Sequence, residues 1–262
     1  DGLIQIAVGT HALFQDDVAF QNLGLVIVDE QHRFGVAQRL ALKNKGQDVH
    51  QLMMSATPIP RTLAMSFFAD LDVSVIDELP PNRTPIKTRL VNSLRRTQVE
   101  SFVLSTCQKG QQAYWVCPLI EESETLQLQT AVDTQLELQQ ALPDLSIGLV
   151  HGRMKSADKA AVMAEFSAGR IDVLVATTVI EVGVDVPNAS LMVIEHAERM
   201  GLAQLHQLRG RVGRGAAASA CVLIFSEPLS ELSKARLKVI YEHTDGFEIA
   251  RQDLNIRGPG EF

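Results

Sequence analysis

Two adjacent acids, Asp29 and Glu30, follow an apolar run near the start of the sequence, and such a pair could support a hydrolytic reaction. They lie in LVIVDEQHRFG, residues 25–35, where the apolar run meets charged and polar residues. Carboxylate oxygens suit a hard cation such as Mg²⁺, and a second carboxylate nearby can orient or deprotonate an attacking water. Because a turn that merely ends a strand is the commoner meaning of so short a motif, both interpretations stay open at this point.

Two further apolar runs also end in small hydroxyls. MMSATPIPRT places Ser55 and Thr57 where they could hydrogen-bond the acidic pair, although a strand followed by two proline turns explains the same residues. ATTVIEVGVDVPNA places Thr177 at the end of its run, followed by Gly183 and Asp185. Hydroxyls and turn amides of this kind can hold a nucleic-acid phosphate, and the alternative is a polar loop.

A third candidate is the arginine-rich segment LAQLHQLRGRVGRG, residues 202–215. We predict a helix in which Gln207, Arg211 and Arg214 share one face. The opposite, apolar face would hold Leu202, Leu205, Leu208 and Val212. Arginine suits phosphate oxygens, and an arginine reaching in from a second domain can stabilise charge that develops during phosphoryl transfer. A solvated basic face is the alternative, but the two glycines within the segment would weaken a merely solvated helix without need.

Three other polar residues lie near predicted strand ends. Thr10 and His11 belong to VGTHAL, residues 8–13, and Arg153 belongs to VHGRM, residues 150–154. A histidine in such a place, taken singly, is more often structural than functional, so these segments carry little weight alone.

The elements that must position these residues alternate between apolar runs and helical patterns. The predicted strands are residues 23–28, 50–56, 112–120, 146–151, 171–178, 190–195 and 220–225. Unbroken apolar runs are typical of strands buried on both faces of a parallel sheet. The predicted helices between them include residues 97–110, 130–143 and 157–169. This alternation predicts a doubly wound α/β fold, in which ligands bind at the carboxyl ends of the strands.

The proline-rich stretch DELPPNRTPIKT is the best candidate for a linker between two domains. It predicts a first domain over residues 1–82, with too few strands for a complete sheet, and a second over 83–226, with a full set of five. Two helical patterns separated by an Asp-Gly pair predict a helical hairpin within residues 227–262.

Composition sets the remaining bounds. With 46% hydrophobic and 21% charged residues among 262, the chain is predicted to be an ordinary soluble protein without a membrane helix or signal peptide, hence cytoplasmic. The net charge of −7 argues against a dedicated nucleic-acid-binding domain but allows a local basic track. The three cysteines form no metal-binding or disulfide pattern, so we expect buried thiols. Because the sequence opens on Asp1 rather than methionine, we expect a fragment.

Taken in order, these stretches resemble the later motifs of the superfamily 2 helicases. DEQH matches motif II, SAT motif III, VHGRM part of motif IV, TTVIEVGVDVP motif V and QLRGRVGRG motif VI. The resemblance covers essentially the whole chain, and five motifs in the right order are much more specific than any one of them. It implies two RecA-like domains: the C-terminal part of an ATP-binding domain, then a complete helicase C-terminal domain. The start of a hairpin that couples ATP hydrolysis to translocation would follow.

Within that superfamily the chain is similar to the RecG family of branch-migrating DNA helicases. DEQHRFG, TPIPRTLAM, DELPPNRTP, IEVGVDVPNASLMVIE and DLNIRGPGE carry this resemblance. The related transcription-repair coupling translocases are the alternative, but there we would expect an acid at Gln31 and a small residue at Pro259.

The resemblance implies catalytic roles for four residues, with ATP and Mg²⁺ as cofactors. Asp29 would hold the Mg²⁺ of Mg-ATP, and Glu30 would be the base for the attacking water. Arg211 and Arg214 would be arginine fingers across the cleft between the domains. The implied residues for ATP binding and coupling are Gln31, His32, Ser55, Thr57, Gly183, Asp185 and Gln207.

The resemblance also implies a DNA track and partners. Residues toward the track would be Thr10, His11, Arg153, Thr177 and Arg257. The implied partners are stalled forks, Holliday junctions and a single-strand DNA-binding protein. The implied whole is a monomer at the bacterial nucleoid that acts in recombination and repair, away from membranes.

The departures from the family pattern limit what this chain can do alone. No GxxxxGK[ST] loop occurs in the sequence, and that loop would cradle the ATP phosphates. The DNA-wedge domain of the family is also missing. We therefore expect the chain alone to be inactive as an ATPase, and a catalytically dead DNA-binding module is a competing hypothesis. A metal-dependent hydrolase that uses Asp29, Glu30 and His32 together is disfavoured, since neighbouring side chains on an extended strand end point to opposite faces.

Overall fold

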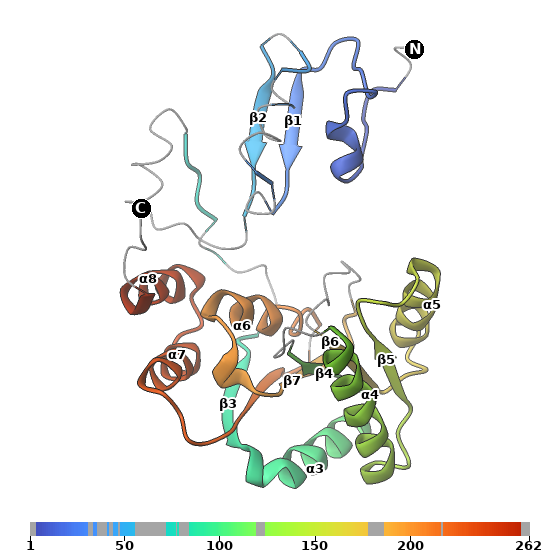
Figure 1. The fold of residues 1–262 in the computed structure, drawn as a ribbon, viewed down its shortest axis with the longest axis vertical. Helices are drawn as coiled ribbons and strands as arrows, with labels where there is room; N and C mark the ends of the chain where they lie inside the picture. Colours follow the sequence, from blue (N-terminus) through green and yellow to red (C-terminus); the bar gives the residue numbers. More distant parts are fainter. Residues whose placement is uncertain are drawn as a thin grey trace. The chain divides into compact units, whose positions relative to one another are not determined.

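The computed structural model divides the chain into two compact units, Asp1–Pro58 and Ile59–Phe262, each of which is described separately (Figure 1). The residues that the structure describes are 4–30, 34–35, 41, 44–46, 48–55, 72–76, 78, 84–118, 124–177, 186–215 and 217–257. The sequence predicted a domain boundary at residue 82 instead. Because most of residues 59–83 lie outside the described part, that boundary stays a prediction.

In the first unit, two short parallel strands form a sheet. Strand β1, Leu25–Val28, pairs with β2, His50–Met53, and a short 3₁₀ helix, η1, His11–Phe14, precedes them. Val26 and Val28 are buried against a small apolar cluster, whereas Leu25 and Ile27 are 56% and 57% exposed. The predicted burial on both faces is therefore wrong for β1, because alternate side chains of a strand point to opposite faces.

The second unit contains a six-stranded parallel sheet in the order β3-β8-β7-β4-β6-β5. Its strands are β3, Lys87–Asn92; β4, Gln112–Cys117; β5, Ile147–Val150; β6, Val173–Thr177; β7, Ala189–Ile194; and β8, Ala220–Phe225. The helices among its described residues are α3, Arg96–Cys107; α4, Glu124–Ala141; α5, Ser156–Ser167; α6, Leu202–Arg209; α7, Glu231–Glu242; and α8, Gly246–Arg257. Two 3₁₀ turns, η3, Ser93–Arg95, and η4, Ala197–Arg199, follow β3 and β7.

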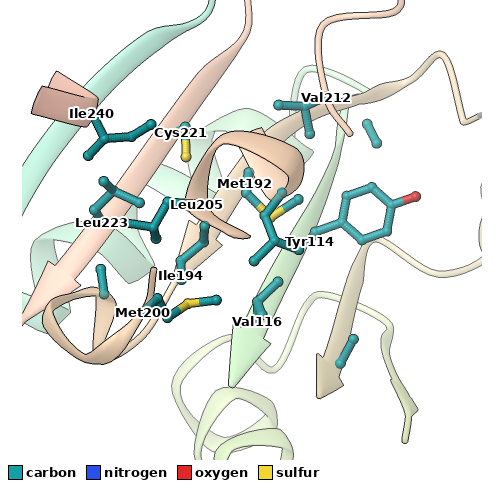
Figure 2. Packing of buried hydrophobic residues seen from close by; sticks show 14 of the residues in the cluster. Tyr114, Val116, Met192, Ile194, Met200, Leu205, Val212, Cys221, Leu223 and Ile240 are labelled. Atoms are coloured by element: carbon teal, nitrogen blue, oxygen red, sulfur yellow. The ribbon is translucent and has the colours of Figure 1, made fainter. Parts of the chain in front are cut away.

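Helices cover both faces of this sheet, as the sequence predicted for a doubly wound fold. Along β4, Trp115 packs with residues of α3 and α4 on one face, whereas Tyr114 and Val116 pack with residues of α5, α6 and α7 on the other. Figure 2 shows the second of these cores, in which Leu205 of α6 lies against strand residues such as Ile194. Strands β4, β6 and β7 are buried along their whole length, which explains their unbroken apolar runs.

Strand β3 is the element that the sequence analysis missed. Its sequence, KTRLVN, was assigned in part to the linker, because charged residues interrupt the apolar ones. The strand lies at the edge of the sheet and pairs only with β8 among the described strands, so Lys87 and Arg89 can remain exposed. The Arg89 guanidinium lies 4.9 Å from the centre of the Phe102 ring on α3. Edge strands commonly carry such charged side chains.

The predicted helical hairpin is confirmed by α7 and α8, which contact each other and both contact α6 (Figure 1). The side chain of Ser230 caps α7 by accepting a hydrogen bond from Ser233 N at 3.1 Å. The three cysteines are buried and free, also as predicted. None of the helices in the described part of the chain is long and apolar enough to cross a membrane.

Candidate functional site

The acidic pair lies at the carboxyl end of β1, where the sequence placed it. Asp29 is exposed, and its Oδ1 accepts a hydrogen bond from the backbone N–H of Glu30 at 2.8 Å. Glu30 has a φ of +50°, in the left-handed region that non-glycine residues seldom occupy. The strand thus ends in a tight turn that the first acid itself stabilises. Such backbone outliers cluster at functional sites, which supports the catalytic interpretation.

The chemistry of Asp29 suits a hard cation. One carboxylate oxygen is occupied by the Glu30 amide, and an ionised carboxylate has a second oxygen that can accept a water or bind Mg²⁺. Ser55 follows β2 at the same edge of this sheet, since Met54 N donates to Val28 O at 2.8 Å. The predicted partners Gln31, His32 and Thr57 lie outside the described residues.

Thr10 and His11 form the start of η1 in the same unit. The carbonyl of Thr10 accepts from Leu13 N at 3.0 Å, so this residue ends the extended segment before the turn. The His11 ring lies 4.6 Å from the Phe34 ring and 5.9 Å from the Phe14 ring, centre to centre. His11 therefore packs against aromatic rings, and Phe34 follows the DEQH segment closely along the chain.

In the second unit, Thr177 and Arg153 lie at the carboxyl ends of neighbouring strands. Thr177 ends β6 and is only 4% exposed, so it offers little surface to a large ligand. Arg153 follows β5 in an exposed turn. Burial is the main cause that lowers the pKa of His151, and the positive charges of Lys159 and Arg153 lower it further. Gly183 and Asp185 lie outside the described residues.

The predicted helix over residues 202–215 is wrong in its second half. Helix α6 ends at Arg209, with Gly210 as its C-cap, so Gln207 lies on the helix whereas Arg211 and Arg214 do not. Gly213 has a φ of +79°, which a continuing helix would not allow. The glycines that seemed costly within a helix instead form the turn that ends it. Arg211 is partly exposed and Arg214 is exposed.

The loop after α6 lies near the amino ends of β3 and β7. A Cβ atom added at Gly213 would lie 3.0 Å from a side-chain atom of Ile86, just before β3. One added at Gly215 would clash with the carbonyl of Pro187, just before β7. The loop that carries Arg211 and Arg214 is therefore pressed against the segment that follows TTVIEVGVD in the sequence. The assignment of the two segments to one site stays a prediction, because Gly183 and Asp185 lie outside the described residues.

Arg209 has a structural role that its sequence motif did not indicate. It is 3% exposed, and its Nη1 donates to Ile240 O and His243 O, both at 2.8 Å. Its Nη2 lies 3.0 Å from Nδ1 of His206 and 3.3 Å from Thr244 O. Burial lowers the pKa of its guanidinium. Arg209 follows Leu205 by four positions and Leu202 by seven, and this spacing placed it on the apolar face of α6.

Arg257 is the last residue of α8. Helix α8 contacts α6 and α7, so the backbone of Arg257 belongs to the group of three packed helices that Arg209 helps to stabilise. The placement of its side chain lies outside what the structure describes.

Two family models match different parts of the chain, and the division agrees with the order of the sequence motifs. Residues 1–66 match a model described as DEAD/DEAH box helicase, and residues 94–216 match a model described as helicase conserved C-terminal domain. The first match contains Asp29 and Glu30, and the second contains Arg211 and Arg214. The resemblance to helicases is thereby confirmed independently of any single motif.

Individual relatives are more specific. The chain is 63% identical to the ATP-dependent DNA helicase RecG of Escherichia coli K12, over 100% of the chain and 38% of that protein. It is 54% identical to the Thermotoga maritima protein of the same name, covering 34% of it. Among solved structures, RecG bound to a three-way DNA junction matches 97% of the chain and 32% of that protein with a TM-score of 0.77 and 51% identity. Yeast Dbp5 bound to RNA matches with a TM-score of 0.62 at 17% identity, which shows the fold alone.

Proposed function

We propose that this chain, which belongs to the RecG family of helicases, supplies part of an ATP-driven motor that moves along branched DNA. The observation that carries the proposal is the 63% identity, over the whole chain, to a protein named as an ATP-dependent DNA helicase. The match to a RecG structure bound to a three-way DNA junction supports branched DNA as the substrate class. Stalled forks and Holliday junctions are the branched forms that we infer, in recombination and repair.

The proposed division of labour among these residues rests on the resemblance to the helicase motifs. Asp29 would hold the Mg²⁺ of Mg-ATP, and the ion would neutralise phosphate charge there. Glu30 orients or deprotonates the attacking water. Arg211 and Arg214, in the loop after α6, stabilise the charge that develops on the transferred phosphoryl group. Ser55 and Gln207 serve coupling, together with Gln31, His32, Thr57, Gly183 and Asp185.

The nucleic-acid side of the proposal rests on different residues. Arg153 is exposed at the end of β5 and suits phosphate contact, as does the turn at Thr10 and His11. Thr177, the last residue of β6, and Arg257, the last residue of α8, complete the proposed set. The motor acts as a monomer at the nucleoid, and a single-strand DNA-binding protein is its proposed partner.

A chimera tests this proposal. In it, residues 1–262 replace the matching 38% of the E. coli K12 relative, and ATP hydrolysis is measured with and without a three-way DNA junction. We expect hydrolysis that the junction stimulates, and a loss of turnover in Glu30→Gln. Junction-independent turnover, or unchanged turnover in Glu30→Gln, would contradict the proposal.

The isolated chain provides a second, separate measurement. Because its sequence contains no GxxxxGK[ST] loop, we expect no junction-stimulated hydrolysis from residues 1–262 alone. If the isolated chain instead binds forked DNA with an affinity that falls steeply as salt rises, it acts as a DNA-binding module by itself. Measurable turnover would show that the phosphate loop is dispensable.

A further inference from the structure

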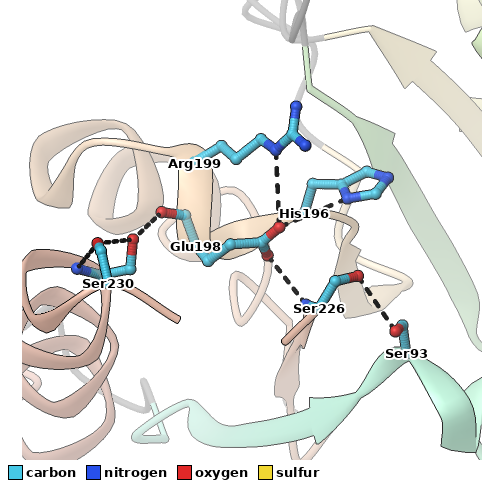
Figure 3. A network of polar contacts seen from close by, with 7 residues as sticks. Ser93, His196, Glu198, Arg199, Ser226 and Ser230 are labelled. Carbon is cyan, nitrogen blue, oxygen red and sulfur yellow. Dashed lines mark hydrogen bonds and ion pairs between the residues drawn. The ribbon is translucent and has the colours of Figure 1, made fainter. Parts of the chain in front are cut away.

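A network of polar contacts centres on Glu198, in the turn η4 that follows β7 (Figure 3). The side chain of Glu198 is only 10% exposed. Its Oε2 accepts a hydrogen bond from the backbone N–H of Ser226 at 3.3 Å. Its Oε1 lies 3.6 Å from Nδ1 of His196 and 3.8 Å from Nε of Arg199. The carboxylate is thus surrounded by donors and by a cation, although no role for it is apparent from the sequence motifs.

The network joins the carboxyl ends of three adjacent strands. Ser226 directly follows β8, and its Oγ donates to Oγ of Ser93, the residue that follows β3, at 3.1 Å. Glu198 follows β7, which lies next to β8 in the sheet. His196, between β7 and η4, has a φ of +47°, so the chain reverses sharply to bring Glu198 back over the strand ends.

The same turn also holds the first turn of α7. Ser233 Oγ donates to the backbone carbonyl of Glu198 at 2.9 Å and contacts Ser230 Oγ at 3.0 Å. Ser230 is the N-cap of α7 (Figure 3). One residue therefore contacts β8 through its side chain and α7 through its backbone. A change in the η4 backbone would therefore alter the contact with Ser226, after β8, and the contact with Ser233, on α7.

Helix α7 is consequently held at both ends by one continuous segment of chain. Residues of η4 hold its amino end through Ser233, and Arg209 at the end of α6 holds its carboxyl end through Ile240 O and His243 O. This segment continues directly into the loop that carries Arg211 and Arg214. The α7–α8 hairpin is thus attached at two places. One attachment is Arg209, which directly precedes the loop with the candidate arginine fingers. The other is η4, which follows the carboxyl end of β7.

We propose that Glu198 is a positioning residue that fixes the amino end of α7 to the sheet, so that the α7–α8 hairpin follows the sheet as one body. In a motor this attachment would decide how much of each ATP-driven movement reaches the hairpin, and that consequence rests on the proposed function. The attachment itself does not. Loss of the Glu198 carboxylate frees Ser226 N and loosens η4, and α7 then pivots about its remaining contacts with Arg209.

Amide hydrogen exchange tests the attachment without any assumption about activity. In the chimera, Glu198→Ala should speed exchange of the amides of residues 233–236 about tenfold, because a charge-assisted hydrogen bond is lost. Amides of residues 239–243 should change little, since Arg209 still holds them. Ser233→Ala removes the direct hydrogen bond to the Glu198 carbonyl, leaves the carboxylate in place and should give the same pattern. Unchanged exchange at residues 233–236 in both variants would overturn the proposal.

The consequence for the motor is measured as base pairs separated per ATP hydrolysed. We expect Glu198→Ala to lower this ratio about threefold with little change in ATP turnover, because coupling rather than chemistry is altered. Glu198→Gln keeps the acceptor for Ser226 N and should restore most of the ratio. Glu165→Gln, in an exposed ion pair on α5, is the matched control and should leave both quantities unchanged.

The two layers of the inference fail in distinguishable ways. If the unaltered chimera hydrolyses no ATP, the proposed function fails, yet the exchange experiment still decides whether Glu198 holds α7. If exchange changes as expected but the ratio does not, Glu198 holds α7 without affecting coupling, and the proposed consequence for the motor is refuted. Equal losses of turnover and of unwinding would refute it as well.

Discussion

Arg209 differs sharply from Arg211 and Arg214, although all three lie in one short stretch at the end of α6. The Arg209 guanidinium is buried and donates to backbone carbonyls at the end of α7. Arg211 is partly exposed, Arg214 is exposed, and both lie on a glycine-containing loop beyond the helix. Arginines and glycines alternate closely there, in RGRVGRG, so the pattern of residue types hardly distinguishes the three arginines. What distinguishes them is where the helix stops.

The difference separates a buried residue that holds the fold from two residues that lie on a loop at the surface. A buried guanidinium that satisfies helix-end carbonyls has its donors committed, and helix carboxyl ends favour a nearby cation. An arginine on a loop at the surface can reach a phosphate that arrives from another domain. The comparison therefore predicts opposite outcomes for substitutions only two positions apart.

The largest expected effect is on ATP turnover. Arg211→Ala in the chimera should lower turnover with a three-way junction about a thousandfold, since an arginine finger stabilises charge in the transition state. The same variant should change the free energy of unfolding by no more than about 0.5 kcal/mol, because its side chain is partly exposed. Steady-state ATPase assays and denaturant titrations measure the two quantities. Near-normal turnover would remove Arg211 from the catalytic set.

The second effect reverses that pattern at Arg209. Arg209→Met should lower the free energy of unfolding by about 3 kcal/mol, because buried carbonyls of α7 lose their donor. Fluorescence of Trp115, the one tryptophan in the sequence, reports this directly, since its side chain is 0% exposed in the core of the second unit. Arg209→Lys keeps the charge but not the planar fork, so we expect an intermediate loss. If Arg209→Met is as stable as Arg211→Ala, the contrast between the two sites is wrong.

The fold was predictable where burial alone decides the pattern. Strands β4, β6 and β7 are apolar along their whole length because helices cover both faces of the sheet, and the sequence shows this directly. Strand β3 was missed because an edge strand needs only one covered face and can carry Lys87 and Arg89 outward. The first sheet was predicted to be more buried than it is, since Leu25 and Ile27 are apolar but exposed.

The membership of the candidate site stays a prediction from the sequence, and its local geometry could not be predicted. Motif order identified Asp29, Glu30, Arg211 and Arg214, and the strand end at Asp29 is where the sequence placed it. The turn beyond α6 was not foreseen, because helical spacing continued through glycines whose backbone conformation only the structure shows. Glu198 carries no signal in the sequence, since Ser226 and Ser233, which it contacts, lie about thirty residues further along the chain.

A third effect concerns the pH dependence of the Arg209 site. Burial, and then the charge of Arg209, lower the pKa of His206 to about 4 from 6.5, while Asp245 acts weakly in the opposite direction. A guanidinium can only donate, so Nδ1 of His206 must accept and the ring must be neutral. The stability contributed by the neutral ring is complete above pH 6.5 and is lost as the pH falls toward 4.

Unfolding free energies between pH 7.5 and 4.5 measure this contribution. We expect the wild-type chain to lose about 2 kcal/mol more over this range than His206→Gln, whose amide oxygen can accept from Arg209 without titrating. Parallel pH profiles for the two proteins would show that His206 titrates normally. In that case Arg209 would not hold its neighbour in the neutral form.

The smallest expected effect tests whether burial, rather than an ion pair, decides how much an arginine stabilises this fold. Arg170 forms a hydrogen-bonded pair with Glu165 at the end of α5, with 60% of the Arg170 side chain exposed. Because water and salt screen such a pair, Arg170→Ala should leave the Trp115-detected unfolding midpoint unchanged within error. An exposed arginine with a carboxylate partner would then matter less than buried Arg209, whose guanidinium contacts carbonyls, a hydroxyl and an imidazole. A clear loss of stability in Arg170→Ala would mean that pairing, rather than burial, ranks the arginines of this protein.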